Sequence, residues 1–206
     1  MPYYNVKIKD NRIVHIINKL WGTEVSDKQK IRLATIWLDG CSGCHMSILD
    51  MDERLVEIAE YVDVVYSPYV DTKEFPVNVD LTIVEGALST DHDIRMINKI
   101  RKNSKLILAL GDCAITGNIS AMKNLYGSDA VLKKGYLDLA DINESGKYPS
   151  KIVPKLLDKV IPLHEAVKVD YFLPGCPTPP DAIYEVLTAL IEGEDINIHQ
   201  LTRFGK

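Results

Sequence analysis

The chain has 206 residues, of which 46% are hydrophobic and 26% charged, values typical of a globular protein with one sizeable core. Its net charge of −5 leaves no basic surplus to neutralise phosphates, which disfavours nucleic acid and anionic membrane surfaces as partners. The longest apolar stretches are too short to span a bilayer and Met1–Leu20 lacks the continuous apolar core of a signal peptide, so we expect a cytoplasmic protein.

The N-terminal segment, residues 1–30, predicts a small hairpin or an extended arm, because Tyr4–Ile8 and Ile13–Ile17 flank a polar turn. The rest, residues 31–206, alternates short apolar runs with longer amphipathic ones. The apolar runs predict strands over Arg32–Leu38, Val62–Tyr66, Asp80–Val84, Lys105–Leu110 and Asp170–Leu173. Helices are expected from about His45 to Tyr61, over Asp91–Arg101 with Asp91 as the cap, and from the run Pro179-Pro180-Asp181 to about Glu192.

This alternation predicts an α/β fold with a doubly wound parallel sheet and right-handed crossovers. The strands are apolar along most of their length, as strands covered on both faces must be. Segment Asn124–Pro149 interrupts the pattern with glycines, tyrosines and mixed charges, although Leu125–Leu132 is expected to be partly helical. An insertion of this length within one domain is typical of a functional or partner-binding loop.

All four cysteines follow runs that are predicted to be strands, and each has a glycine within two residues. Cys41 and Cys44 follow the first strand, whereas Cys113 and Cys176 follow the fourth and the fifth. The carboxyl ends of parallel strands meet at one edge of a sheet, where ligands bind, so we expect the thiols to converge there. Cytoplasmic thiols are kept reduced, which favours metal binding over disulfides. Four thiolates are the ligand set of one [4Fe–4S] cluster, and such a cluster predicts an electron relay.

Two other uses of these cysteines remain open from the residues alone. Four thiolates also form structural zinc sites, although those sites usually have two close cysteine pairs and only Cys41 and Cys44 are close here. By itself that pair would suit thiol–disulfide exchange at a helix N-terminus, but Cys113 and Cys176 are then unexplained. Nothing in the residues requires a nucleotide or a flavin, since neither GxxxxGK[ST] nor GxGxxG occurs.

Two further side chains are candidates to support the cysteine loops. Glu85 ends the third predicted strand and is expected to point to the same edge, where it would bind a cysteine loop or local backbone N–H groups. His45 directly follows Cys44 and is a candidate donor, although a histidine at a helix start is usually partly solvated. Four more polar residues are expected in turns, caps or loops: Asp112, Thr116, His92 and His164.

Four motifs, taken in order, resemble those of the small subunit of [NiFe] hydrogenases. They are Asp39–Cys44 (DGCSGC), Glu85–Ala87 (EGA), Gly111–Gly117 (GDCAITG) and Pro174–Pro177 (PGCP), and the resemblance extends over about residues 33–190. The same lineage includes the cluster-bearing connecting subunit of respiratory complex I, but that subunit has an adjacent cysteine pair. The hydrogenase branch fits better because two residues separate the first two cysteines here.

This resemblance implies a flavodoxin-like fold in which Cys41, Cys44, Cys113 and Cys176 ligate one [4Fe–4S] cluster. In that family a large subunit carries the nickel–iron centre, where hydrogen is split, and the small subunit passes the electrons outward. The chain shows neither the twin-arginine signal nor the cysteine-rich C-terminal domain of membrane-linked members. It most resembles the cytoplasmic NAD-reducing class, whose diaphorase subunits carry FMN and the NAD site and whose reaction is H2 + NAD+ = H+ + NADH. Soluble classes with another acceptor, the sulfhydrogenases and the coenzyme F420-independent enzymes, are the alternative.

Overall fold

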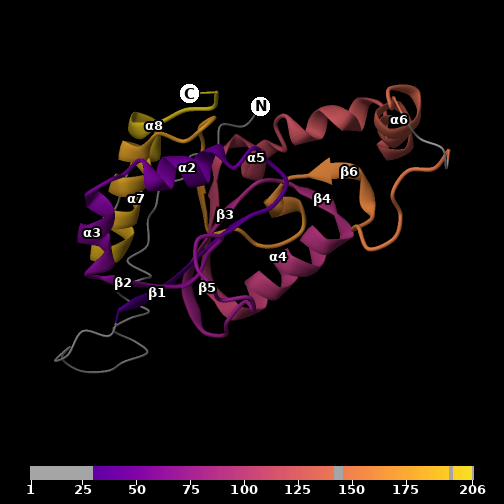
Figure 1. Cartoon of the computed structure of the whole chain (residues 1–206). Coiled ribbons are helices and arrows are strands. Elements are labelled where there is room, and N and C mark those ends of the chain that lie inside the picture. The colour runs from indigo at the N-terminus through magenta and orange to yellow at the C-terminus, as the bar shows by residue number, and fades with distance from the viewer. Residues whose placement is uncertain (1–29, 142–145, 195–196, 206) are drawn as a thin grey trace.

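The structure is a computed structural model that describes residues 30–141, 146–194 and 197–205 (Figure 1). The two halves of the predicted hairpin, Tyr4–Ile8 and Ile13–Ile17, lie outside the described residues. The N-terminal arm and the domain boundary that follows it therefore stay predictions.

A parallel sheet of five strands forms the centre of the fold, in the order β2–β1–β3–β5–β7. The strands are β1 (Ile31–Trp37), β2 (Val62–Tyr66), β3 (Val79–Glu85), β5 (Ser104–Leu110) and β7 (Tyr171–Leu173). Counted along the chain, the order of these strands is 2-1-3-4-5, which is that of flavodoxin-like sheets. The predicted strands and the predicted fold are confirmed.

Helices cover both faces of this sheet, with α3 and α7 on one side and α4 on the other (Figure 1). The helices are α2 (Gly43–Leu49), α3 (Arg54–Ala59), α4 (Asp91–Asn103), α5 (Gly111–Thr116), α6 (Ser128–Lys133), α7 (Pro180–Glu192) and α8 (Ile198–Leu201). Short turns of other helix types are η1 (Ser120–Leu125), η2 (Lys134–Asp138) and η3 (Leu163–Glu165). None of the helices in the described ranges is both long and apolar enough to cross a membrane.

Alternate residues of each strand face opposite sides of the sheet and so build two hydrophobic cores. Leu33 and Leu108 pack in the first core with Ile183 of α7. Their neighbours Ala34 and Ala109 pack in the second core, with α4 and α5. This two-sided burial explains why the strand sequences are apolar almost throughout.

The single helix predicted from His45 to Tyr61 is wrong, because the structure has two short helices there, α2 and α3. Asp52, in the link between them, has φ 51, a left-handed conformation that cannot continue a right-handed helix. The link also places Met51 in the first core, where it is 2% exposed. The buried Met51 fits an interruption between α2 and α3. The helical periodicity of the sequence did not reveal this interruption.

The predicted cap of α4 is also wrong: Thr90, not Asp91, caps this helix. Thr90 Oγ1 accepts from the Asp93 backbone N–H at 3.1 Å, and Asp93 Oδ2 accepts from the Thr90 N–H at 2.8 Å. This reciprocal pair satisfies two N–H groups, one more than a single cap would satisfy. His92 consequently lies in the first turn of α4 instead of a loop, while His164 lies in the short turn η3.

Two strands were not predicted and form a separate antiparallel pair, β4 (Leu88–Thr90) with β6 (Leu156–Ile161). Between α5 and β6 the chain forms η1, α6 and η2, so the expected helical character of Leu125–Leu132 is confirmed. This excursion extends away from the central sheet (Figure 1).

Candidate metal centre

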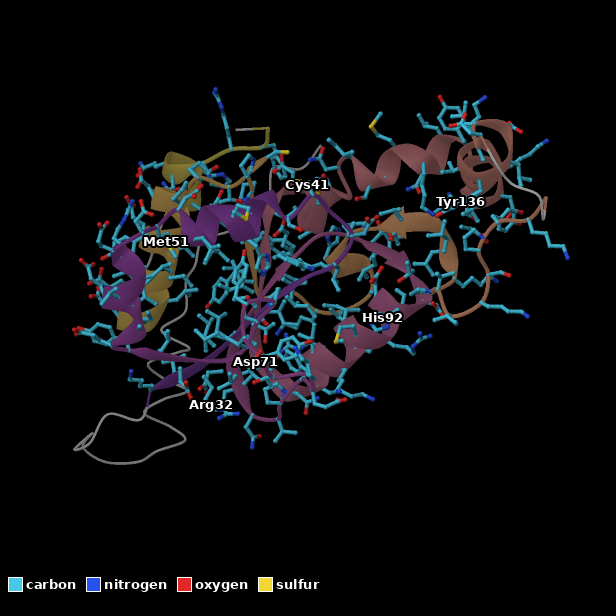
Figure 2. The ribbon with its side chains drawn as sticks, viewed as in Figure 1. Arg32, Cys41, Met51, Asp71, His92 and Tyr136 are labelled. Atoms are coloured by element: carbon cyan, nitrogen blue, oxygen red, sulfur yellow. The ribbon has the colours of Figure 1, made fainter. Side chains whose placement is uncertain are left out.

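The three cysteine loops all follow the carboxyl ends of strands in the central sheet. Cys41 and Cys44 come after β1, Cys113 lies in the first turn of α5 directly after β5, and Cys176 comes after β7. Figure 2 shows Cys41 at this edge, next to the start of α2. The topology therefore places all the predicted ligands at one edge of the sheet.

Close backbone contacts join the loops to one another. The Asp112 N–H donates to the Gly175 carbonyl at 2.9 Å, and the Gly175 N–H returns a bond to Asp112 Oδ1 at 2.7 Å. A Cβ atom added to Gly111 would clash with Cys44 Sγ, and one added to Gly40 would lie 4.0 Å from Cys113 Sγ. Glycine at position 111 thus allows the Cys44 sulfur to approach the backbone, whereas the contact at Gly40 is an ordinary van der Waals distance.

Thiol electrostatics also indicate that the cysteines are near one another. Burial raises the pKa of Cys113, and the nearby thiols of Cys176 and Cys41 raise it further. Burial likewise raises the pKa of Cys44 to about 11, with a smaller contribution from the charge of Glu85. Such a thiol stays protonated at neutral pH until a metal cation displaces the proton.

The arrangement does not match a site for one metal ion. In the described ranges, which include all four cysteines, no group of three or more His, Cys, Asp or Glu side chains is placed to hold a single ion. A tetrahedral zinc site with Zn–S bonds of about 2.3 Å would require all four sulfur atoms to surround one ion. All four cysteines are free thiols. An all-thiolate donor set spread around one edge fits a multi-iron cluster better than zinc.

Glu85 at the end of β3 holds the first cysteine loop. Its carboxylate accepts from the backbone N–H groups of Cys44 at 3.2 Å and His45 at 2.8 Å, and it also pairs with His45 Nδ1. Ser42 precedes α2 but makes no side-chain cap, so the buried carboxylate satisfies the first N–H groups of this helix.

The expectation that His45 is partly solvated is wrong, because its side chain is 0% exposed. Its ring packs edge-on against Trp37 at a centroid distance of 5.4 Å and against Tyr69 at 6.0 Å. The Glu85 carboxylate explains the burial, since it provides a partner for a polar ring that would otherwise be costly to bury. Nε2 has no hydrogen-bond partner among the described residues.

Two residues of the site were not predicted. Asp112, expected as a turn former, is buried and its Oδ2 accepts from the Gly205 N–H at 2.7 Å, which ties the C-terminal segment to the cysteine loops. Asn118 Nδ2 donates to Cys176 Sγ at 3.3 Å. The pair Gly117-Asn118 signals a turn in the sequence, but nothing local connects Asn118 with a cysteine 58 positions away.

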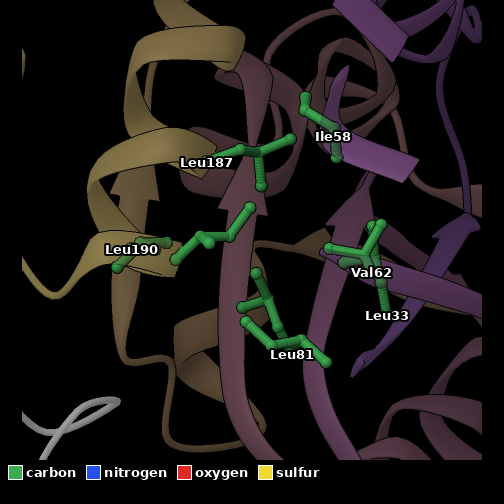
Figure 3. A pocket seen from close by; sticks show the side chains of 8 residues that line it. Leu33, Ile58, Val62, Leu81, Leu187 and Leu190 are labelled. Atoms are coloured by element: carbon green, nitrogen blue, oxygen red, sulfur yellow. The ribbon is translucent and has the colours of Figure 1, made fainter. Parts of the chain in front are cut away.

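A small apolar pocket lies away from the cysteines (Figure 3). It is formed by the first halves of the strands and by α3 and α7, and its lining residues are Ile31, Leu33, Ile58, Val62, Leu81, Leu187, Leu190 and Ile191. With no polar side chain in this lining, the pocket offers no group for catalysis or for metal binding.

Known proteins resemble the chain over most of its length. A family model described as NADH ubiquinone oxidoreductase, 20 Kd subunit, matches residues 41–190. The delta subunit of the NAD-reducing hydrogenase HoxS of Cupriavidus necator is 37% identical over 82% of this chain and 82% of that subunit. One subunit of the F420-non-reducing hydrogenase of Methanothermobacter marburgensis is 38% identical over 82% of this chain. The chain spans only 56% of that relative's length.

A solved structure agrees with these sequence relatives. One chain of an NAD+-reducing [NiFe]-hydrogenase in the H2-reduced state matches with a TM-score of 0.81 and 34% identity. The match covers 85% of this chain and 99% of that one. The resemblance predicted from the four motifs is confirmed.

Proposed function

Since the chain belongs to the family of the NADH ubiquinone oxidoreductase 20 Kd subunit, we propose that it is the electron-transferring small subunit of a cytoplasmic NAD-reducing [NiFe] hydrogenase. We assign one [4Fe–4S] cluster to Cys41, Cys44, Cys113 and Cys176. The observation that carries this assignment is that three cysteine loops meet at one edge of a parallel sheet, where hydrogen bonds join the loops of Cys113 and Cys176.

A [4Fe–4S] cluster, when bound, takes up and releases single electrons. The chain's own residues fix the loops that carry its ligands, of which Cys44 is buried, Cys113 is partly buried, and Cys41 and Cys176 are exposed. Glu85 fixes the Cys44 backbone, and Asp112 ties the loop of Cys113 to Gly175, next to Cys176. Leu110 and Leu173, which end β5 and β7, are fully buried below these loops. A site that changes little on reduction needs such fixed ligands.

The proposed partners follow from the same assignment. A nickel–iron large subunit would split hydrogen, and diaphorase subunits with FMN would reduce NAD+. The similarity to the HoxS delta subunit and to a chain of an NAD+-reducing hydrogenase supports this acceptor. In this scheme the small subunit contributes no acid, base or nucleophile, only the path of the electrons.

Anaerobic purification of the tagged full-length chain from its host tests the proposal directly. We expect a co-purifying large subunit, nickel and iron, and an EPR signal of a reduced [4Fe–4S] cluster, with NADH formed when NAD+ is added under hydrogen. A chain that emerges alone, with zinc or with no metal, would disprove it.

An F420-non-reducing hydrogenase is the second candidate, because relatives of that name are as similar in sequence as the HoxS delta subunit. Both candidates assign the same ligands to this chain and differ only in the electron acceptor. Hydrogen-dependent reduction of an artificial dye, without reduction of NAD+ by the intact complex, would favour the second candidate.

A further inference from the structure

Asn118 contacts one of the proposed ligand thiols across two loops. Its side-chain Nδ2 donates a hydrogen bond to Cys176 Sγ at 3.3 Å. Asn118 follows α5, whereas Cys176 follows β7, so this contact joins the loops of Cys113 and Cys176.

The backbone around Asn118 holds this amide in place. Its φ of 38 lies in the left-handed region, which only glycine and a few polar residues such as asparagine adopt readily. The Asn118 N–H donates to Thr116 Oγ1 at 3.3 Å, and its carbonyl accepts from the Ala121 N–H at 3.2 Å. Glycine would suit this backbone equally well, so what asparagine adds at this position is its amide group.

We propose that Asn118 sets the reduction potential of the [4Fe–4S] cluster by donating a hydrogen bond to the ligand sulfur of Cys176, an inference that rests on the proposed function. A thiolate bound to iron has no proton and can only accept a hydrogen bond, so the N–H side of the amide must face it. Reduction adds one electron and leaves more negative charge on the sulfur atoms. The N–H group therefore stabilises the reduced state more than the oxidised state, and the potential rises.

One-electron reduction of the cluster requires no group of this chain other than the cluster ligands. One electron arrives from the hydrogen oxidation that we propose for the large subunit, and no bond forms or breaks in Asn118. The residue acts on an equilibrium, so its effect is measured as a potential.

Asn118→Gly removes the amide and keeps the left-handed backbone. Asn78→Gly is a matched control, because Asn78 has φ 59 and directly precedes β3, at the opposite edge of the sheet from the cysteines. Both variants are to be purified in the complex and titrated by EPR. The signal of this chain is identified as the one that is missing when Cys113→Ser replaces a proposed ligand.

We expect Asn118→Gly to retain wild-type iron and to lower the midpoint potential by about 59 mV, which is a tenfold change in a one-electron equilibrium. Asn78→Gly should leave the potential unchanged. Asn118→Asp, which keeps the shape and tolerates the same φ, should lower it further because an anion replaces the donor.

An unchanged potential in the cluster-bearing Asn118 variants would overturn the inference. Loss of iron from both of them would also overturn it, since the amide would then be needed to hold the cluster instead of tuning it. A wild-type complex without any [4Fe–4S] signal from this chain would instead refute the proposed function.

Discussion

Glu85 is the residue on which the first cysteine loop depends. Its carboxylate is 3% exposed and makes contacts to the N-terminus of α2 and to the ring of His45. A buried charge is tolerated only where donors surround it, and here two backbone N–H groups and an imidazole do so. The position of the Cys44 backbone is therefore set by a strand that itself contains no cysteine.

Replacing Glu85 with Gln should lower the free energy of unfolding by about 2–4 kcal/mol. The Gln side chain carries no charge, and its NH2 group would face the N–H donors that now bind the carboxylate. Urea unfolding of the chain monitored by circular dichroism measures this loss. The matched control is Glu74→Gln, since Glu74 also pairs with a base, Lys99, but is exposed at the surface. An equal effect of the two substitutions would contradict the role given to Glu85.

The four cysteines should be equally necessary if they share one cluster. We expect Cys113→Ser and Cys176→Ser to remove as much iron and hydrogen turnover as Cys41→Ser, because a missing thiolate leaves one iron of the cluster without its ligand. Metal analysis of the purified complex checks this, with Ser128→Ala in α6 as a control away from the cysteines. Full iron content in the Cys176 variant would show that the four-ligand assignment is wrong.

At the scale of elements, the junction between β5 and α5 is the tightest part of the site. Gly111 joins the strand to the helix with φ 82, and its missing Cβ leaves space for Cys44 Sγ. The helix starts at once, which brings Cys113 to the edge within three residues of the strand's end. A larger residue at position 111 would disfavour this backbone conformation and would clash with Cys44 Sγ.

Gly111→Ala should destabilise the fold and impair cluster loading more than Gly127→Ala. Both glycines have a positive φ, 82 and 81, so each substitution carries a backbone cost of about 1–3 kcal/mol. Gly127 has open space where a Cβ would lie, whereas Gly111 faces Cys44 Sγ, so the clash should add about 1–3 kcal/mol. Thermal unfolding and iron content of the two variants measure the difference, and identical behaviour would disprove the steric argument.

At the scale of the whole molecule, the excursion after the third cysteine loop exposes large apolar side chains. Leu125 is 80% exposed and Tyr126 74% exposed, and Figure 2 shows Tyr136 on the same excursion, far from Cys41. Exposed apolar side chains gathered in one region are typical of surfaces that bind another protein. The excursion begins at Asn118, which contacts Cys176, so it starts at the proposed cluster edge.

Produced without partner subunits, the chain should therefore self-associate and lose iron. Size-exclusion chromatography and metal analysis under anaerobic conditions test this expectation. Leu125→Lys with Tyr126→Lys should reduce the association of the isolated chain, because both side chains are already largely in contact with solvent. A monodisperse wild-type chain with an intact cluster would argue against an obligate partner.

Local sequence patterns predicted the elements of the central sheet well and their connections less well. Continuous apolar runs identified β1, β2, β3, β5 and β7, since strands covered on both faces carry few polar residues. The three-residue β4 and its partner β6 are too short or too polar to give such a signal. The break between α2 and α3 depends on Asp52 adopting a left-handed conformation, which helical periodicity does not register.

The fold class and the position of each cysteine after a strand can be predicted from the sequence alone, because strand periodicity and glycine spacing are local properties. Glu85 was also expected at this edge, because it ends a predicted strand, and its bonds to the first cysteine loop agree with that expectation. The contacts of Asp112 and Asn118 became known only from the three-dimensional arrangement, since they join residues 58 to 93 positions apart. Such contacts are created when parallel strands bring distant loops to one edge, and no local pattern encodes them.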